Sequence, residues 1–122
     1  LHRVDLLGLV SANELAALRE SAQAVVVPSL KEGFGLPVLE AMTAGVPVIT
    51  SDTPALREVG GDAARYESPF DPEGWADAMA EAWQEPALRR SAAIGGPSRA
   101  QTFSWDRTAT QIVAAYNEVL SS

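Results

Sequence analysis

The sequence contains no cysteine and only one histidine. Without cysteine there can be neither a disulfide framework nor a thiolate metal site, a composition typical of proteins from a reducing compartment. The single histidine, His2, lies near the N-terminus and is a poor candidate for a metal ligand. These absences direct attention to carboxylates and backbone amides as the groups that could carry chemistry.

Positive charge is also scarce, with nine lysines and arginines against sixteen acids and a formal net charge of −7. Nucleic acids and anionic membrane surfaces are recognised by clustered cations that neutralise phosphate. We therefore expect no nucleic acid among the main partners. No apolar run is long enough to cross a bilayer and no signal peptide opens the chain, so we expect a cytoplasmic protein.

Apolar residues, in contrast, make up 47% of the 122 residues, which is enough for one domain with a buried core. Apolar clusters and turn residues alternate in a pattern that predicts strands and helices in turn. Strands are predicted at residues 4–9, 24–28, 46–50 and 63–66, and helices at residues 11–21 and 37–44, with a helical turn at 54–58. The predicted fold class is α/β, with a parallel sheet of about four strands and flanking helices.

The C-terminal part of the chain shows a purely helical pattern. Asp71 and Pro72 are typical of a helix start, a second helix is predicted from Pro86 to about Ile94, and the Gly-Gly-Pro at 95–97 should end it. Ser104 should cap a final helix. Apolar stripes on these helices are expected to face the core, and they comprise Trp75, Met79, Ala82, Trp83, Trp105, Ala109, Ile112, Tyr116 and Val119.

The stretch from Glu32 to Val48, E-G-F-G-L-P-V-L-E-A-M-T-A-G-V-P-V, places two carboxylates around a glycine-rich turn. In open parallel sheets ligands bind beyond the carboxyl ends of the strands, and the loops at 29–35 and 51–54 should both reach that edge. Glycines allow the backbone to approach a ligand closely. The amides of Gly35 and Leu36, just before Pro37, lie at a predicted helix start, a place that favours anions.

Glu32 and Glu40 would repel a phosphate, but an ionised carboxylate accepts hydrogen bonds from sugar hydroxyls. A ligand with phosphate between two polyols, as in a nucleotide-sugar, would suit both the acids and the amides. The residues alone leave alternatives open. Glu40 could simply complement a helix dipole while Glu32 is solvated, or the two could form the acid pair of a glycosidase. A receiver-like domain would need an acid where Pro28 and Ser29 stand.

Residues 28–51, P-S-L-K-E-G-F-G-L-P-V-L-E-A-M-T-A-G-V-P-V-I-T-S, resemble the E-x7-E region of retaining GT-B glycosyltransferases of the group 1, family 4-like type. The flanking sequences V-D-L-L-G-L-V, A-V-V-V-P-S and F-S-W are also similar to that family. The resemblance implies that residues 1–122 are an incomplete, Rossmann-like C-terminal domain that binds a nucleotide-sugar donor. The N-terminal acceptor domain of the family has no counterpart here.

The resemblance also implies roles for single residues. Glu32 matches the catalytic-site acid that contacts the donor sugar, and Glu40 matches the acid that binds the ribose hydroxyls. The remaining donor-binding positions implied by the resemblance are Gly33, Phe34, Gly35 and Leu36 in the loop and Leu9 and Val10 beside the base. The family's transfer proceeds with retention, and neither a metal nor another cofactor is expected.

Two departures from the family pattern limit this interpretation. The segment that brings an arginine and a lysine to the diphosphate has no match here, and Lys31 does not replace it, so the isolated chain is expected to be inactive. The family's strand order would also leave residues 4–9 two strands away from residues 24–28, exposing a sheet edge that invites self-association. Expected partners are the nucleotide-diphosphate sugar, a sugar, lipid or other acceptor, and the missing upstream part of the enzyme, which could be peripheral to a membrane. The alternative is a non-catalytic binding or assembly module that needs a partner chain.

Overall fold

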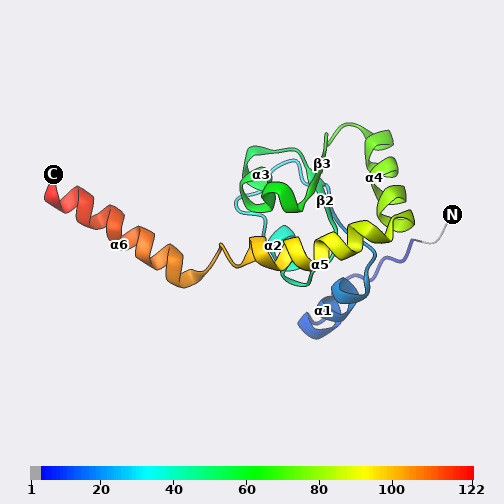
Figure 1. The fold of residues 1–122 in the computed structure, drawn as a ribbon, viewed down its shortest axis with the longest axis horizontal. Helices are drawn as coiled ribbons and strands as arrows, with labels where there is room; N and C mark the ends of the chain where they lie inside the picture. The colour runs from blue at the N-terminus through cyan, green and yellow to red at the C-terminus, as the bar shows by residue number, and fades with distance from the viewer. Residues whose placement is uncertain (1–3) are drawn as a thin grey trace.

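The computed structural model describes residues 4–122 and shows an α/β body from which one long helix projects (Figure 1). The sheet consists of β1 (Val25–Val27), β2 (Val48–Ser51) and β3 (Arg65–Glu67). The helices are α1 (Ala12–Ser21), α2 (Leu36–Thr43), α3 (Pro54–Gly60), the 3-10 helix η1 (Gly61–Ala63), α4 (Pro72–Gln84), α5 (Pro86–Ala100) and α6 (Trp105–Ser121). The predicted α/β class is confirmed.

The three strands are parallel and lie in the order β1-β2-β3, with Val26 opposite Ile49 and Thr50 opposite Tyr66. The central strand β2 is buried along its whole length. Successive side chains of a strand point to opposite faces of the sheet, so β2 contributes Val48 to one core and Ile49 to the other. A parallel strand that is buried on both faces reads as a continuous apolar run, as the sequence does here.

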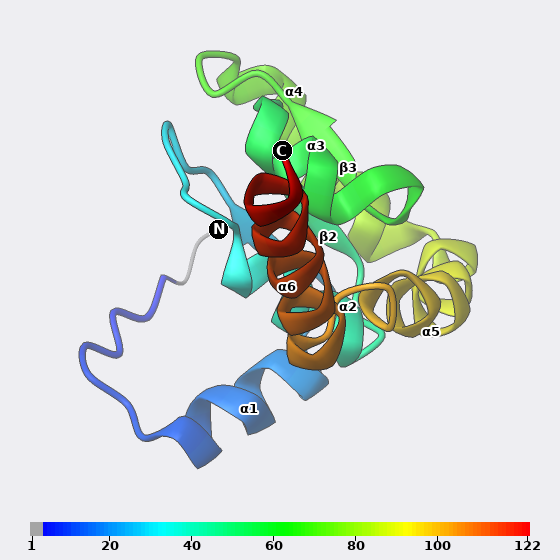
Figure 2. The same ribbon diagram turned by 90° about the vertical axis from the view of Figure 1, so that its left-hand side faces the viewer.

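Helices cover both faces of this small sheet. The larger core joins β1 and β2 to α2, α3 and α5, and its members are Val27, Val38, Ala41, Met42, Val48, Leu56, Val59 and Ala100. The second core lies under α4 and contains Ile49, Trp75, Ala78 and Ala82. Figure 2, turned by a right angle from Figure 1, again shows α1 and α4 on opposite sides of the sheet. No helix within residues 4–122 is long and apolar enough to span a membrane.

The predicted strand at residues 4–9 is wrong. This segment has no strand partner and is exposed from Val4 to Leu9, so the sheet has three strands rather than about four. An apolar composition predicts a strand only where a neighbouring strand can pair with it, because strand propensity depends on context. In the described chain no such neighbour reaches residues 4–9.

The predicted break at residues 95–97 is also wrong, because α5 continues through Gly95, Gly96 and Pro97 to Ala100. Packing explains the continuity. A Cβ atom at Gly96 would lie 2.7 Å from the carbonyl oxygen of Met42, so α5 crosses α2 at a distance that only glycine permits. Ala100, on the far side of Pro97, is buried in the larger core. Tertiary contacts on both sides of the proline thus outweigh its local cost.

The expectation that the apolar stripes of the C-terminal helices face the core holds for Trp75 and Ala82 but fails for the other residues of α4 and for α6. Trp83 is 74% exposed and Met79 is half exposed on α4. Helix α6 contains no buried residue, and Figure 1 shows it extending away from the body. Its apolar stripe is therefore uncovered within residues 4–122.

Candidate functional site

The candidate site lies at the carboxyl edge of the sheet, where the loops after β1 and β2 lead into α2 and α3. Because the two strands are parallel, both loops reach the same edge, as predicted. The two helix starts are in contact there: a Cβ atom at Gly35 would lie 2.7 Å from Cδ2 of Leu56. The structure thus brings the glycine-rich loop against the first turns of α3.

Gly35 is the N-cap of α2 and has a left-handed backbone with φ of 94°. No side chain caps this helix start. The carbonyl of Gly35 accepts hydrogen bonds from the amides of Val38 at 3.0 Å and Leu39 at 3.2 Å, while Pro37 has no amide to donate. Among residues 4–122 no hydrogen bond from the Leu36 amide is found, and a first-turn amide left open in this way is the arrangement expected of an anion site at a helix N-terminus.

Glu32 is half-buried in the loop before α2 and is oriented by a neighbour. The hydroxyl of Ser29 donates a hydrogen bond of 2.8 Å to Oε1 of Glu32. The next residue, Gly33, has open space where a side chain would stand, with no atom within 4 Å. Packing within the fold therefore does not require glycine at position 33. A ligand that approaches the backbone closely would require it.

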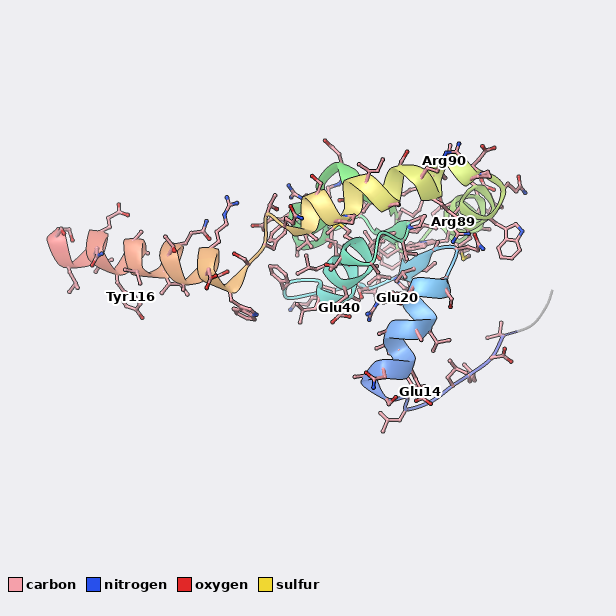
Figure 3. The ribbon with its side chains drawn as sticks, turned by 60° about the horizontal axis from the view of Figure 1, so that its bottom comes forward. Glu14, Glu20, Glu40, Arg89, Arg90 and Tyr116 are labelled. Atoms are coloured by element: carbon pink, nitrogen blue, oxygen red, sulfur yellow. The ribbon has the colours of Figure 1, made fainter. Side chains whose placement is uncertain are left out.

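Glu40 lies on α2, one turn beyond the helix start, and forms an ion pair with Arg19 of α1. The distance from Nη2 of Arg19 to Oε2 of Glu40 is 2.6 Å. The side chain of Glu40 is 49% exposed, whereas that of Arg19 is only 17% exposed. Figure 3 shows Glu40 facing the C-terminal end of α1, beside Glu20. Sequence reasoning missed Arg19, because nothing in the α1 sequence pairs it with a residue 21 positions away.

The aromatic residue of the loop, Phe34, packs edge-to-face on Phe103 with 5.8 Å between ring centroids. The guanidinium of Arg99 lies over the Phe103 ring, 5.2 Å from its centre. Phe103 belongs to the connection between α5 and α6. The loop is therefore supported from the C-terminal segment, while Leu36 beside it stays exposed.

Leu9 and Val10 precede α1, and Leu9 is fully exposed. In the described chain no hydrogen bond joins either residue to the loop at 32–36, so their place beside a base stays a prediction. Ser11, which follows them, forms a capping box with Glu14: the Glu14 amide donates to Ser11 Oγ and the Ser11 amide donates to Glu14. The hydrogen bond that the Ser11 amide donates to the carboxylate is the largest cause that lowers the pKa of Glu14. The segment is thus anchored to α1 rather than to the loop.

The loop after β2 carries a second ion pair, between Asp52 and Arg57 of α3, with Nη2 to Oδ2 at 3.0 Å. The hydrogen bonds from Arg57 lower the pKa of the Asp52 carboxyl. The same guanidinium lies 4.4 Å from the centre of the Tyr66 ring, and burial raises the pKa of that tyrosine. Arg57 is a cation at the candidate edge that sequence reasoning also missed. Its charge is already balanced by Asp52.

Metal ligands were not predicted for this site. Among residues 4–122, no group of three or more histidine, aspartate or glutamate side chains is placed to hold a metal ion. The acids of the loop and α2 are instead each paired with one local donor.

Comparisons with known proteins agree on one family. Residues 1–99 match the family described as glycosyl transferases group 1. The chain is 40% identical over 110 residues to the O-antigen chain mannosyltransferase B of Escherichia coli, covering 90% of this chain and 29% of that protein. It is 38% identical over 116 residues to an MMP alpha-(1->4)-mannosyltransferase of Mycolicibacterium hassiacum, covering 92% of this chain and 28% of that protein.

A solved structure gives the same result for the fold. The sucrose-phosphate synthase of Thermosynechococcus elongatus superimposes with a TM-score of 0.82 at 31% identity, over 98% of this chain and 31% of that protein. This confirms the predicted Rossmann-like GT-B architecture. The chain spans less than a third of the length of the proteins it matches. It belongs to the glycosyl transferases group 1 family.

Proposed function

We propose that this chain forms the donor-binding part of a retaining glycosyltransferase, which moves a sugar from a nucleotide-sugar to an acceptor. The observation that carries the proposal is the uncapped start of α2 at Gly35, flanked by the carboxylates of Glu32 and Glu40. Amides suit the diphosphate, and acids suit the hydroxyls on either side of it. The family membership and the named activities of the relatives support the same reading.

Each group has a separate task in this proposal. The amides of Gly35 and Leu36 bind the diphosphate of the donor. Glu32, held by Ser29, accepts hydrogen bonds from the donor sugar and orients it for transfer. Glu40 accepts hydrogen bonds from the ribose. Retention is taken from the family resemblance, and transfer is proposed to need no metal.

The site on this chain is incomplete for catalysis. A leaving diphosphate needs positive charge to stabilise it, and the cations near this edge are engaged. Arg57 is paired with Asp52, and Arg99 donates to the carbonyls of Glu58 and Val59. Lys31 precedes Glu32 in an exposed part of the loop, and we assign it no role. The cations and the acceptor site would come from the rest of a longer enzyme. We therefore propose that the 122-residue chain binds donor nucleotide without turning it over.

Calorimetric titration of the chain with UDP, GDP and ADP tests the proposal. We expect at least one of them to bind with a dissociation constant on the order of micromolar to tens of micromolar. Glu40→Gln should weaken this binding, whereas Glu32→Gln should leave it nearly unchanged, because a nucleoside diphosphate lacks the donor sugar that Glu32 is proposed to contact. Glu20→Gln removes a neighbouring carboxylate of α1 as the matched control (Figure 3). Equal losses in the Glu32 and Glu40 variants would contradict the division of tasks.

A second candidate function is a module that assembles with a partner. Two apolar segments of the kind that is normally buried are exposed to solvent among residues 4–122. They are the stretch from Val4 to Leu9 and the apolar stripe of α6. Sheet edges at β1 and β3 could also pair between copies. Light scattering over a range of concentrations tests this function. A chain that stays monomeric and binds none of the three nucleotides would contradict both candidates for the isolated chain.

A further inference from the structure

Helix α1 is attached to the body in an unusual way. It contains no buried residue, and only three residues separate it from β1. Within residues 4–122, the pair between Arg19 and Glu40 is the one hydrogen bond or ion pair that joins α1 to α2. A further hydrogen bond of 2.7 Å, from Arg89 to Gln23, ties the connection after α1 to α5. The position of α1 thus depends on few polar contacts, and one of them uses a predicted ligand-binding acid.

The ion pair differs from an ordinary surface pair. Exposed pairs between flexible side chains contribute little, because ordering both side chains costs entropy. Here the Arg19 side chain is mostly buried, so its guanidinium is restricted by the surrounding protein, whereas the Glu40 carboxylate stays about half exposed and accessible to a ligand. At 2.6 Å the contact has the short distance of a charge-assisted hydrogen bond.

The two oxygens of Glu40 are consequently in different situations. Oε2 accepts from Arg19, and Oε1 has no hydrogen-bond partner among the described residues. A free glutamate must give up rotamer freedom when it binds a ligand, and that cost reduces affinity. A carboxylate with one oxygen already fixed gives up less, and its second oxygen remains an acceptor for a hydroxyl.

We infer that Arg19 is a positioning residue, which holds the Glu40 carboxylate in the orientation that binds the ribose hydroxyls of the donor. This inference rests on the proposed function of Glu40. Arg19 itself contacts no ligand; it acts through the acid that it orients. The opposite arrangement, in which Arg19 competes with the ligand for Glu40, would make removal of Arg19 strengthen binding, so the sign of the effect separates the two.

The test measures the ribose preference of the complete 122-residue chain. The tightest binder among UDP, GDP and ADP is titrated beside its 2′,3′-dideoxy form, and the ratio of dissociation constants gives the preference. For the unmodified chain we expect about a tenfold preference, the size of a hydrogen bond to a charged group. Arg19→Met should reduce it about fivefold, and Arg19→Lys should restore part of it because the charge returns.

Two controls separate positioning from a structural effect. Arg90 is an exposed arginine on α5, with no hydrogen bond or ion pair in the described chain, and Arg90→Met should leave the preference unchanged (Figure 3). In a Glu40→Gln background, Arg19→Met should have no further effect on the preference, because the carboxylate that it orients is gone. A merely structural Arg19 would weaken ribose and dideoxy nucleotides equally in both backgrounds.

The outcomes distinguish this inference from the function on which it rests. If Arg19→Met keeps the full ribose preference while Glu40→Gln loses it, the inference is overturned and the proposed function stands. If the dideoxy nucleotide binds the unmodified chain as tightly as the ribose form, Glu40 does not bind the ribose. Both the role of Arg19 and the proposed role of Glu40 are then overturned. Circular dichroism checks each variant for folding, and Arg19→Lys decides the question if Arg19→Met does not fold.

Discussion

Two adjacent glycines in α5 should respond with opposite signs to the same substitution. Gly95 is exposed, and a Cβ atom there would meet nothing within 4 Å. At Gly96 the Cβ atom would lie 2.7 Å from the carbonyl oxygen of Met42 and 3.3 Å from its Cα atom. These are backbone atoms of α2, which cannot rotate away as a flexible side chain can. Gly95→Ala therefore adds only helix propensity, whereas Gly96→Ala also forces α5 and α2 apart.

The expected changes in the free energy of unfolding follow from helix propensity and from overpacking. Replacing glycine by alanine within a helix stabilises by roughly 0.5–1 kcal/mol, which is the whole effect expected for Gly95→Ala. Overpacking a close helix contact costs about 1–3 kcal/mol, so Gly96→Ala should destabilise by about 1–2 kcal/mol overall. Urea unfolding followed by circular dichroism measures both changes. Stabilisation by both substitutions, or destabilisation at Gly95, would refute the continuous helix and its close contact with α2.

Two further predictions concern the carboxyl edge of the sheet. Gly35→Ala should lower the free energy of unfolding by about 1–2 kcal/mol in the same assay, because φ of 94° strains any side chain and the Cβ atom would meet Leu56. An unchanged stability would contradict the left-handed N-cap. Because Arg57 lowers the folded-state pKa of Asp52, the stabilisation from this pair is present above about pH 4 and is lost as the pH falls through the lowered pKa. Asp52→Asn should therefore lose less stability than the unmodified chain between pH 7 and pH 3, and equal losses would argue against the pair.

Local signals in the sequence predicted the elements whose causes are local. Asp71 and Ser104 cap α4 and α6 as expected. The break predicted at residues 95–97 failed for a reason that is not local. Gly96 permits a contact with Met42, more than fifty positions earlier in the chain, and no local rule weighs such a contact against a proline.

In the candidate site, too, the features with local causes could be predicted and the long-range contacts could not. The edge on which the loops after β1 and β2 meet could be predicted, because parallel strands and strand–loop–helix order fix it. The ligand-binding roles of Glu32 and Glu40 stay predictions. Arg19 could not be anticipated, because it meets Glu40 only through the tertiary fold. Arg57 meets Asp52 only five positions away, a local pair that sequence reasoning missed. Sequence patterns locate a site edge more readily than the side chains that orient its acids.

The apolar stripe of α6 is another feature that the sequence predicts only in part. Helical spacing establishes that Ile112, Tyr116 and Val119 share a face, but it does not say which surface covers that face. In the structure all three are more than half exposed, although the helix has an N-cap at Ser104 and regular hydrogen bonding. A stripe of this kind costs solubility unless something buries it. The stripe therefore supports the proposed assembly with a partner. The donor site proposed at Gly35 would likewise need further positive charge, since Arg57 beside it is paired with Asp52.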